Sequence, residues 1–120
     1  MKKILWVSQH VPLPRQLEAL ERLFGAGTIV QQDPRPFSSA EDIANRYREG
    51  GYDDIVVVAP LSVIGRLVDL GIRPLWSEMQ QVDPKTGNPD IVFRGRGYKF
   101  VKFRRVKTLR LEFEELECSI

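Results

Sequence analysis

Two short polar segments hold the residue types best suited to chemistry, and each closes an apolar run typical of a buried strand. Ser8-Gln9-His10 ends the run that begins at Ile4, and Ala59-Pro60-Leu61-Ser62 ends the run that begins at Ile55. A hydroxyl and an imidazole beside a helix N-terminus could bind a phosphate and activate a nucleophile near neutral pH. The candidate catalytic residues are therefore Ser8, His10 and Ser62, and the candidate ligand contacts are Gln9, Pro60 and Leu61.

The same residues also have a plain structural interpretation. Polar side chains commonly end buried strands, and Ser62 is suited to cap a helix because its hydroxyl can accept a hydrogen bond from a backbone N–H. His10 is the only histidine and Cys118 the only cysteine. One histidine with scattered carboxylates makes no metal cluster, and neither a P-loop nor a Gly-x-Gly-x-x-Gly segment follows any strand. We expect neither a metal nor a cofactor.

A third segment resembles the RNP1 motif of the RNA-recognition motifs. Residues 96–103, Arg-Gly-Tyr-Lys-Phe-Val-Lys-Phe, match seven of its eight positions, and Lys99 stands where Gly or Ala is expected. Alternate aromatic rings could stack bases while the basic side chains between them meet phosphates. In the other interpretation this is an amphipathic strand with Tyr98, Phe100 and Phe103 in the core. Three predicted helices precede the segment, which departs from the order of a compact RNA-recognition motif and favours a local convergence.

The charge distribution singles out the same region. The net charge is +2, but residues 91–111 carry eight basic and no acidic side chains, and residues 112–120 carry four glutamates. A block of like charge in a folded domain is either a solvated face or the footprint of an anionic partner. The candidate nucleic-acid contacts are Arg94, Arg96, Tyr98, Lys99, Phe100, Lys102, Arg104 and Arg105.

The elements that must position these residues alternate between strand and helix over residues 1–80. Short β-branched runs predict strands at residues 4–8, 28–32, 54–59 and 72–79. Apolar residues at helical spacing predict helices at residues 13–24, from Ser38 or Ser39 to Gly50, and from a Ser62 cap to Gly71. Right-handed crossovers make this order, β-α-β-α-β-α-β, a Rossmann-like parallel sheet with helices on both faces. The fold class is therefore α/β.

After the turn-rich segment that ends at Asp90, the sequence pattern changes from alternating strands and helices to strands alone. Ile91–Phe93 and the run from Tyr98 flank Arg-Gly-Arg-Gly, and Leu109, Leu111 and Phe113 then alternate with charged residues. We predict a basic antiparallel β-hairpin extension over residues 90–116, with two or three strands. It would lie on the edge of the sheet or pair with another subunit, because an isolated hairpin is marginally stable.

Three side chains that look functional are explained more simply by their position in the predicted elements. Trp76 and Met79 are assigned to core packing, and Gln16 to the water-facing side of its helix. The chain of 120 residues fits a single domain. No apolar run approaches the roughly 20 residues that cross a bilayer, and prolines follow the first strand too soon for a signal peptide. We expect a cytoplasmic protein without a membrane partner.

Several of these segments resemble the minimal CRISPR-associated Rossmann-fold (CARF-like) families. The resemblance rests on Val7-Ser8-Gln9-His10, on the helix from Leu13 to Phe24, and on residues 57–62, Val-Val-Ala-Pro-Leu-Ser. It implies a homodimer whose strand ends bind a cyclic oligoadenylate. It also implies ring-nuclease activity without a metal, in which a ribose 2′-hydroxyl attacks the adjacent phosphate. Ser8, His10 and Ser62 would position or deprotonate that hydroxyl, and the basic hairpin departs from the smallest of these families.

Three functional hypotheses follow from the sequence. The first is a phosphate-rich nucleotide, cyclic or linear, bound at the two strand-end loops, with slow ring-nuclease activity as its catalytic form. The second is a module without catalytic activity that binds single-stranded RNA or DNA through the surface from Arg94 to Arg110. The third is a structural protein in which the hairpin is an oligomerisation element.

Overall fold

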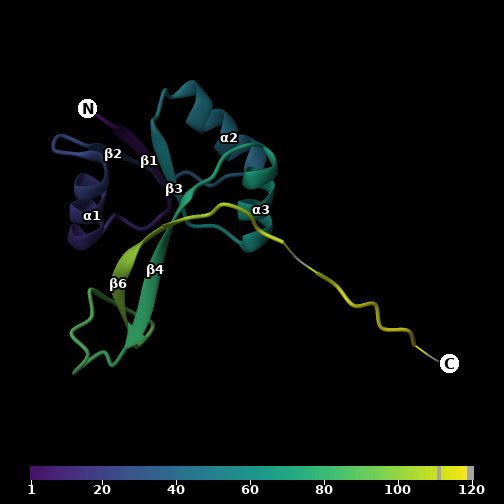
Figure 1. The fold of residues 1–120 in the computed structure, drawn as a ribbon. Helices are drawn as coiled ribbons and strands as arrows, with labels where there is room; N and C mark the ends of the chain where they lie inside the picture. Colours follow the sequence, from purple (N-terminus) through teal and green to yellow (C-terminus); the bar gives the residue numbers. More distant parts are fainter. Residues whose placement is uncertain (111, 119–120) are drawn as a thin grey trace.

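The computed structural model describes residues 1–110 and 112–118 and contains three helices and six strands. Figure 1 shows how they are arranged. The strands are β1 (Lys3–Val7), β2 (Ile29–Asp33), β3 (Asp54–Val57), β4 (Leu75–Val82), β5 (Ile91–Phe93) and β6 (Arg96–Arg105). The helices are α1 (Pro14–Phe24), α2 (Ala40–Glu49) and α3 (Leu61–Asp69). None of the described helices is long and apolar enough to cross a membrane.

All six strands form one mixed sheet in the order β2-β1-β3-β4-β6-β5. The first four strands are parallel, whereas β6 is antiparallel to both β4 and β5. The α/β class, the parallel core and the antiparallel C-terminal strands are confirmed. The strand order and the number of strands differ from the predicted Rossmann pattern, because β3 lies between β1 and β4 and not beyond β2, so that β2 is an edge strand. The hairpin lies on the edge of the sheet, which is one of the two positions expected for it.

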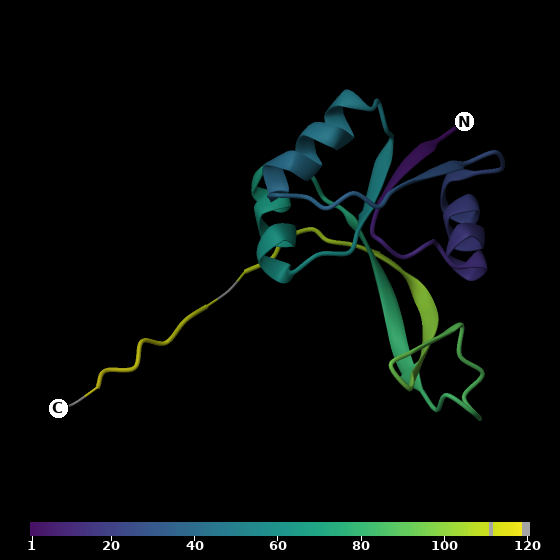
Figure 2. The same cartoon turned by 180° about the vertical axis from the view of Figure 1, so that it is seen from behind.

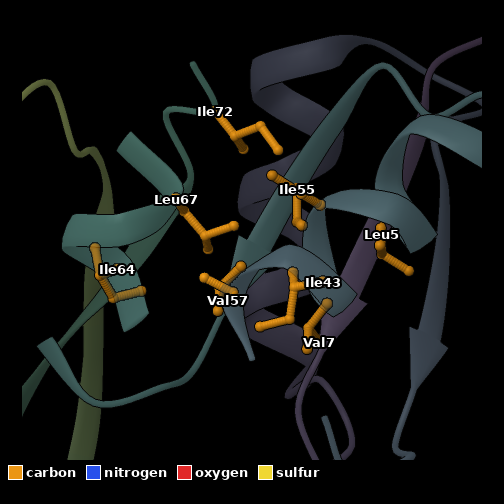
Figure 3. Packing of buried hydrophobic residues seen from close by; sticks show 10 residues of the cluster. Leu5, Val7, Ile43, Ile55, Val57, Ile64, Leu67 and Ile72 are labelled. Carbon is orange, nitrogen blue, oxygen red and sulfur yellow. The ribbon is translucent and has the colours of Figure 1, made fainter. Parts of the chain in front are cut away.

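The helices cover opposite faces of the parallel strands, so that a separate core lies on each face (Figure 1). On the α1 face, Ile4, Trp6 and Val56 pack against Leu20. On the other face, side chains of β1 and β3 pack against α2 and α3 through Ile43, Ile64 and Leu67, as Figure 3 shows. Strands buried on both faces explain why β1 and β3 read as continuous apolar runs.

Two irregularities in β4 and β6 shape the region beyond the parallel core. β3 and β4 are paired only at Val56 and Leu75, so that β4 continues past the end of β3 with β6 as its only described neighbour. The register of β4 and β6 shifts where Glu78 faces Lys102 and Met79 faces Phe100, which makes Val101 an extra residue. Such a bulge reverses the alternation of side chains, and it brings Phe100 and Phe103 to one face of the ribbon. The β4–β6 ribbon projects from the body in Figures 1 and 2.

Three parts of the fold differ most from the sequence prediction, while β1 and β2 are each shifted by one residue and β3 ends two residues early. The N-cap of α3 is Pro60 and the helix begins at Leu61, so Ser62 lies within the first turn and is not the cap. β4 begins and ends three residues later than the predicted strand at 72–79. The predicted third strand of the extension is not formed in its described part, because residues 106–110 and 112–118 carry no strand; Leu111 lies outside the described residues.

Candidate functional site

A cavity of about 480 Å³ lies at the carboxyl ends of β1 and β3, where β4 has separated from β3. The loop after β1 contributes Ser8, His10 and Val11, and the start of α1 contributes Leu13 and Gln16. Its remaining wall comes from the end of β3, the start of α3, the β4–β6 ribbon, β5 and the segment after β6. The hairpin is therefore a wall of this cavity and not a separate appendage.

Hydrogen bonds between side chains and the main chain hold the loop after β1 in place. The indole Nε1 of Trp6 donates a hydrogen bond to the carbonyl oxygen of His10 at 3.0 Å. The backbone N–H of His10 donates to the hydroxyl of Ser8 at 3.0 Å. The carbonyl of Ser8 in turn accepts a hydrogen bond from the side-chain amide of Gln32 at 3.1 Å. These bonds fix the main chain at Ser8 and His10, and the ring of His10 meets Phe93 of β5 edge to face.

Gln16 ties the start of α1 to β4 inside the cavity wall. Its Oε1 accepts a hydrogen bond from the backbone N–H of Leu13 at 2.8 Å, which caps the helix. Its Nε2 donates to the hydroxyl of Ser77 at 2.9 Å. The side chain is buried, contrary to its predicted place on the water-facing side of α1. Leu13 and Leu20 flank Gln16 at helical spacing, so Gln16 lies on the apolar stripe of the helix. This spacing is the sequence signal that could have predicted its burial.

The remaining walls are apolar and aromatic. Trp76 lines the cavity from β4 and is 51% exposed, which contradicts its assignment to the core. Phe93 and Tyr98 line it from the hairpin, and Trp6 lines it from β1. No Lys, Arg, Asp or Glu side chain is among the described residues that line this cavity. An uncharged site with several aromatic walls suits a flat, uncharged group better than it suits a phosphate.

The predicted strand-end site is brought together only in part. Ser8, His10 and Leu61 line the same cavity, whereas Pro60 and Ser62 are not among its described lining residues. Gln9 lines a smaller neighbouring cavity of about 230 Å³. The Ser8 hydroxyl is engaged by the main chain of His10, and no hydrogen bond joins the imidazole to a hydroxyl within residues 1–110 or 112–118. Among these residues the structure thus contains a cavity but no serine–histidine pair joined through the imidazole.

The loop after β2, beside Gln9, is held by an ion-pair cluster. The Arg35 guanidinium and backbone N–H donate to the carboxylate of Asp33 at 2.7 to 3.1 Å. Arg46 of α2 lies 3.6 Å from the same carboxylate and bonds Asp42 at 2.9 Å. The hydrogen bonds from Arg35, aided by the charge of Arg46, lower the pKa of Asp33 to about 2. The cluster fixes the edge of the smaller cavity.

The aromatic residues of the RNP1-like segment do not form an exposed platform. Phe100 is 4% exposed and packs against Phe103, with ring centroids 5.0 Å apart. Tyr98 is half-buried and lines the cavity. The bulge at Val101 explains this arrangement, because it directs Phe100 and Phe103 to the side that packs on Trp6. Of the three aromatic residues of this segment, Tyr98 alone is a lining residue of the cavity.

The basic residues of the hairpin are divided between internal ion pairs and the surface. Arg105 donates to both carboxylate oxygens of Asp54 at 2.8 and 2.6 Å and to the carbonyl of Arg73 at 2.8 Å. The hydrogen bond to Asp54 raises the pKa of Arg105. Arg104 pairs with Glu78 at 3.2 Å, and Arg94 lies over the Phe93 ring at 5.2 Å. Arg96, Lys99 and Lys102 take no part in an ion pair with another described residue.

Sequence reasoning missed the main lining residues of the cavity. Gln16, Trp76 and Ser77 lie on elements that were predicted. The cavity, however, arises because β4 diverges from β3, and no local sequence pattern predicts that divergence. Within the described residues no group of three or more His, Cys, Asp or Glu side chains could hold a metal ion. No family model, curated protein or solved structure matches the chain.

Proposed function

We propose that this protein binds a nucleotide and that the base occupies the cavity at the ends of β1 and β3. The observation that carries the proposal is the uncharged cavity walled by Trp6, Trp76, Phe93 and Tyr98. Aromatic side chains stack on bases with about 1–3 kcal/mol each. Ser8, Gln16 and Ser77 already take part in internal hydrogen bonds, but each hydroxyl or amide has further hydrogen-bonding capacity, such as the Ser8 O–H, that could meet the edge of a base.

The strand order supports this position for a ligand. β1 connects through α1 to β2 on one side, whereas β3 lies on its other side. In doubly wound sheets, ligands bind outside the carboxyl ends of the strands at such a reversal. In this chain, the cavity lies at that reversal.

The phosphates would lie outside the cavity, since its described walls carry no cation. Two groups at the rim suit them. α3 begins at Leu61, which lines the cavity, and the first N–H groups of a helix have no acceptor within the helix. Arg94 is the second group, because its guanidinium lies over Phe93. A nucleotide would therefore bind base inward and phosphate outward.

Cyclic oligoadenylate is the first nucleotide to test, because the resemblance of residues 7–10 and 57–62 to the CARF-like families implies it. A homodimer would present two such cavities to one ring. Cleavage would have the His10 imidazole take the proton of a ribose 2′-hydroxyl, whose oxygen bonds the adjacent phosphorus as the P–O5′ bond breaks. The leaving 5′-oxygen would take a proton from the imidazolium or from water, and the product would end in a 2′,3′-cyclic phosphate. The ligand would therefore bring the reacting hydroxyl.

A thermal-shift titration tests the binding. Cyclic oligoadenylates of several ring sizes, AMP and inorganic phosphate are compared, and linear products are followed by chromatography. The proposal predicts stabilisation by at least one adenine nucleotide and none by phosphate alone. If His10 is the base, His10→Ala removes cleavage but leaves most of the thermal shift. The absence of a shift with every nucleotide would refute the proposal.

Single-stranded RNA or DNA is the second candidate ligand, and one observation favours it. Lys99, Lys102 and Arg104 lie in cross-strand pairs on one face of the β4–β6 ribbon, together with the exposed Trp76. Binding there would rely on phosphate contacts, so its affinity should fall steeply with salt. Binding that is absent or insensitive to salt would remove this candidate.

A further inference from the structure

The C-terminal segment combines exposed apolar side chains with acidic charge. Residues 112–118 run away from the body in both views of the fold (Figures 1 and 2). Phe113 is 86% exposed and Leu116 is 88% exposed. The segment also carries Glu112, Glu114, Glu115 and Glu117 and no basic residue. Exposed apolar side chains gathered in one short segment can mark an interaction site, and the acidic charge of the segment would complement a basic surface.

A basic surface of matching character lies on the outward face of the β4–β6 ribbon. Residues directly opposite in an antiparallel pair share a face, and here the pairs are Trp76 with Arg104, Glu78 with Lys102, and Gln80 with Lys99. We call these six residues the ribbon row. Its inward counterpart, which includes Phe100 and Phe103, packs against the body.

The ribbon row carries an excess of positive charge. Glu78 is its only acidic member, and it is already paired with Arg104 at 3.2 Å. Lys99 and Lys102 form no ion pair within the part of the chain that the structure describes. Exposed Trp76 and the bulged Val101, which is 44% exposed, add apolar surface beside these charges.

We propose that the acidic segment of one copy binds the ribbon row of a second copy, and that the exchange is reciprocal. Glu114 and Glu115 would meet Lys99 and Lys102 of the other copy, while the apolar side chains of the segment would cover Trp76 and Val101. Two identical contacts related by a twofold axis close the assembly as a dimer. This inference rests on the acidic segment and the ribbon row and not on nucleotide binding, although Trp76 of the row also lines the cavity.

The path of the chain favours a second copy over the segment's own ribbon. After β6, the backbone N–H of Val106 bonds the carbonyl of Pro74 at 3.0 Å, and the chain then passes over α3. Leu109 lies against Gly65, where an added β-carbon would come within 3.2 Å of the leucine. From there the segment and the ribbon diverge in both views. The seven residues 112–118 span at most about 25 Å when extended, which is enough to follow a neighbouring ribbon.

The test measures the mass of the full chain by size-exclusion chromatography with light scattering. At low salt the dimer should have twice the mass of the 13.8 kDa chain. It should dissociate as salt rises towards about 1 M, where the Debye length is about 3 Å. Two double variants, Lys99→Glu with Lys102→Glu and Phe113→Ser with Leu116→Ser, should each weaken dimerisation about 10-fold or more. The matched control, Lys2→Glu with Lys85→Glu, makes the same change in net charge and should dimerise normally.

Mixing the two double variants separates exchange between copies from docking within one copy. The tail variant keeps an intact ribbon row and the ribbon variant keeps an intact segment, so the mixture should recover one of the two contacts and form a heterodimer. A wild-type chain that is monomeric at every salt concentration would overturn the proposal. So would a dimer that both variants leave unchanged, or a monomer whose ribbon row binds single-stranded RNA.

Discussion

The ring of His10 meets the ring of Phe93 edge to face, with centroids 5.8 Å apart and planes inclined by 82°. His10 belongs to the loop after β1, whereas Phe93 belongs to β5 at the outer edge of the sheet. The contact places His10, the candidate general base of the proposed nucleotide site, against the hairpin that forms one wall of the cavity. A change in the hairpin should therefore alter both the shape of the site and the surroundings of the imidazole.

Phe93→Ala should weaken nucleotide binding about 5- to 100-fold, because one aromatic wall and the partner of His10 are lost. Binding is measured by calorimetry with the nucleotide that gives the largest thermal shift. Val92→Ala is the control, since Val92 is the neighbouring exposed residue of β5 and does not line the cavity. Equal affinities for the two variants would show that the ligand does not enter this cavity.

Gln16→Leu should lower the free energy of unfolding by about 1–3 kcal/mol. The substitution removes the cap on the Leu13 N–H and leaves the Ser77 hydroxyl without its donor. Urea titration followed by circular dichroism measures the change. Gln31→Leu, at an exposed position of β2, is the control and should cost less than about 0.5 kcal/mol. A Gln16 variant as stable as the wild type would show that the amide bridge contributes little.

Arg105→Gln should be more destabilising than Arg104→Gln. Loss of Arg105 leaves the buried carboxylate of Asp54 without its two charged hydrogen bonds, which should cost about 2–3 kcal/mol. Loss of Arg104 removes a more exposed pair with Glu78, worth about 0–1 kcal/mol. Chemical denaturation compares the variants at one pH. The reverse ranking would contradict the role of Arg105 in fastening β6 to β3.

Asp33 should make the fold more sensitive to acid. The hydrogen bonds from Arg35 lower its folded pKa to about 2, whereas the ordinary pKa of an aspartate is 3.8. The ionised carboxylate therefore adds stability above about pH 4, and that stability is lost as the pH falls towards 2. Asp33→Asn should unfold at a lower temperature than the wild type at pH 7, and the difference should shrink between pH 4 and pH 2. A difference that is constant across this range would exclude the carboxylate as its cause.

The first two thirds of the chain could be predicted well because local pattern and fold agree there. The apolar runs of β1 and β3 and the helical stripe of α1 reflect strands buried on two faces and a helix buried on one. The region from β4 onward depends on contacts between distant segments. A bulge at Val101 decides which rings of β6 are buried, and the single pairing of Val56 with Leu75 opens the cavity.

The candidate site was therefore predicted only at its strand-end loops. Ser8 and His10 follow from the rule that ligands bind beyond the carboxyl ends of parallel strands. Trp76 was assigned to the core because a tryptophan in a strand is usually buried, but β4 has no neighbour at that point other than β6 among the described strands. Gln16 was the one missed residue with a local signal, since it interrupts an apolar stripe.

Tryptophan emission tests the nucleotide site most directly, because both tryptophans of the chain, Trp6 and Trp76, line the cavity. The emission is titrated with AMP and with cyclic oligoadenylates, and inorganic phosphate serves as the control. We expect a saturable change in intensity with an adenine nucleotide, no change with phosphate, and a weaker apparent affinity in Phe93→Ala than in Val92→Ala. Emission that stays constant with every nucleotide, in a chain that is folded by circular dichroism, would contradict the account.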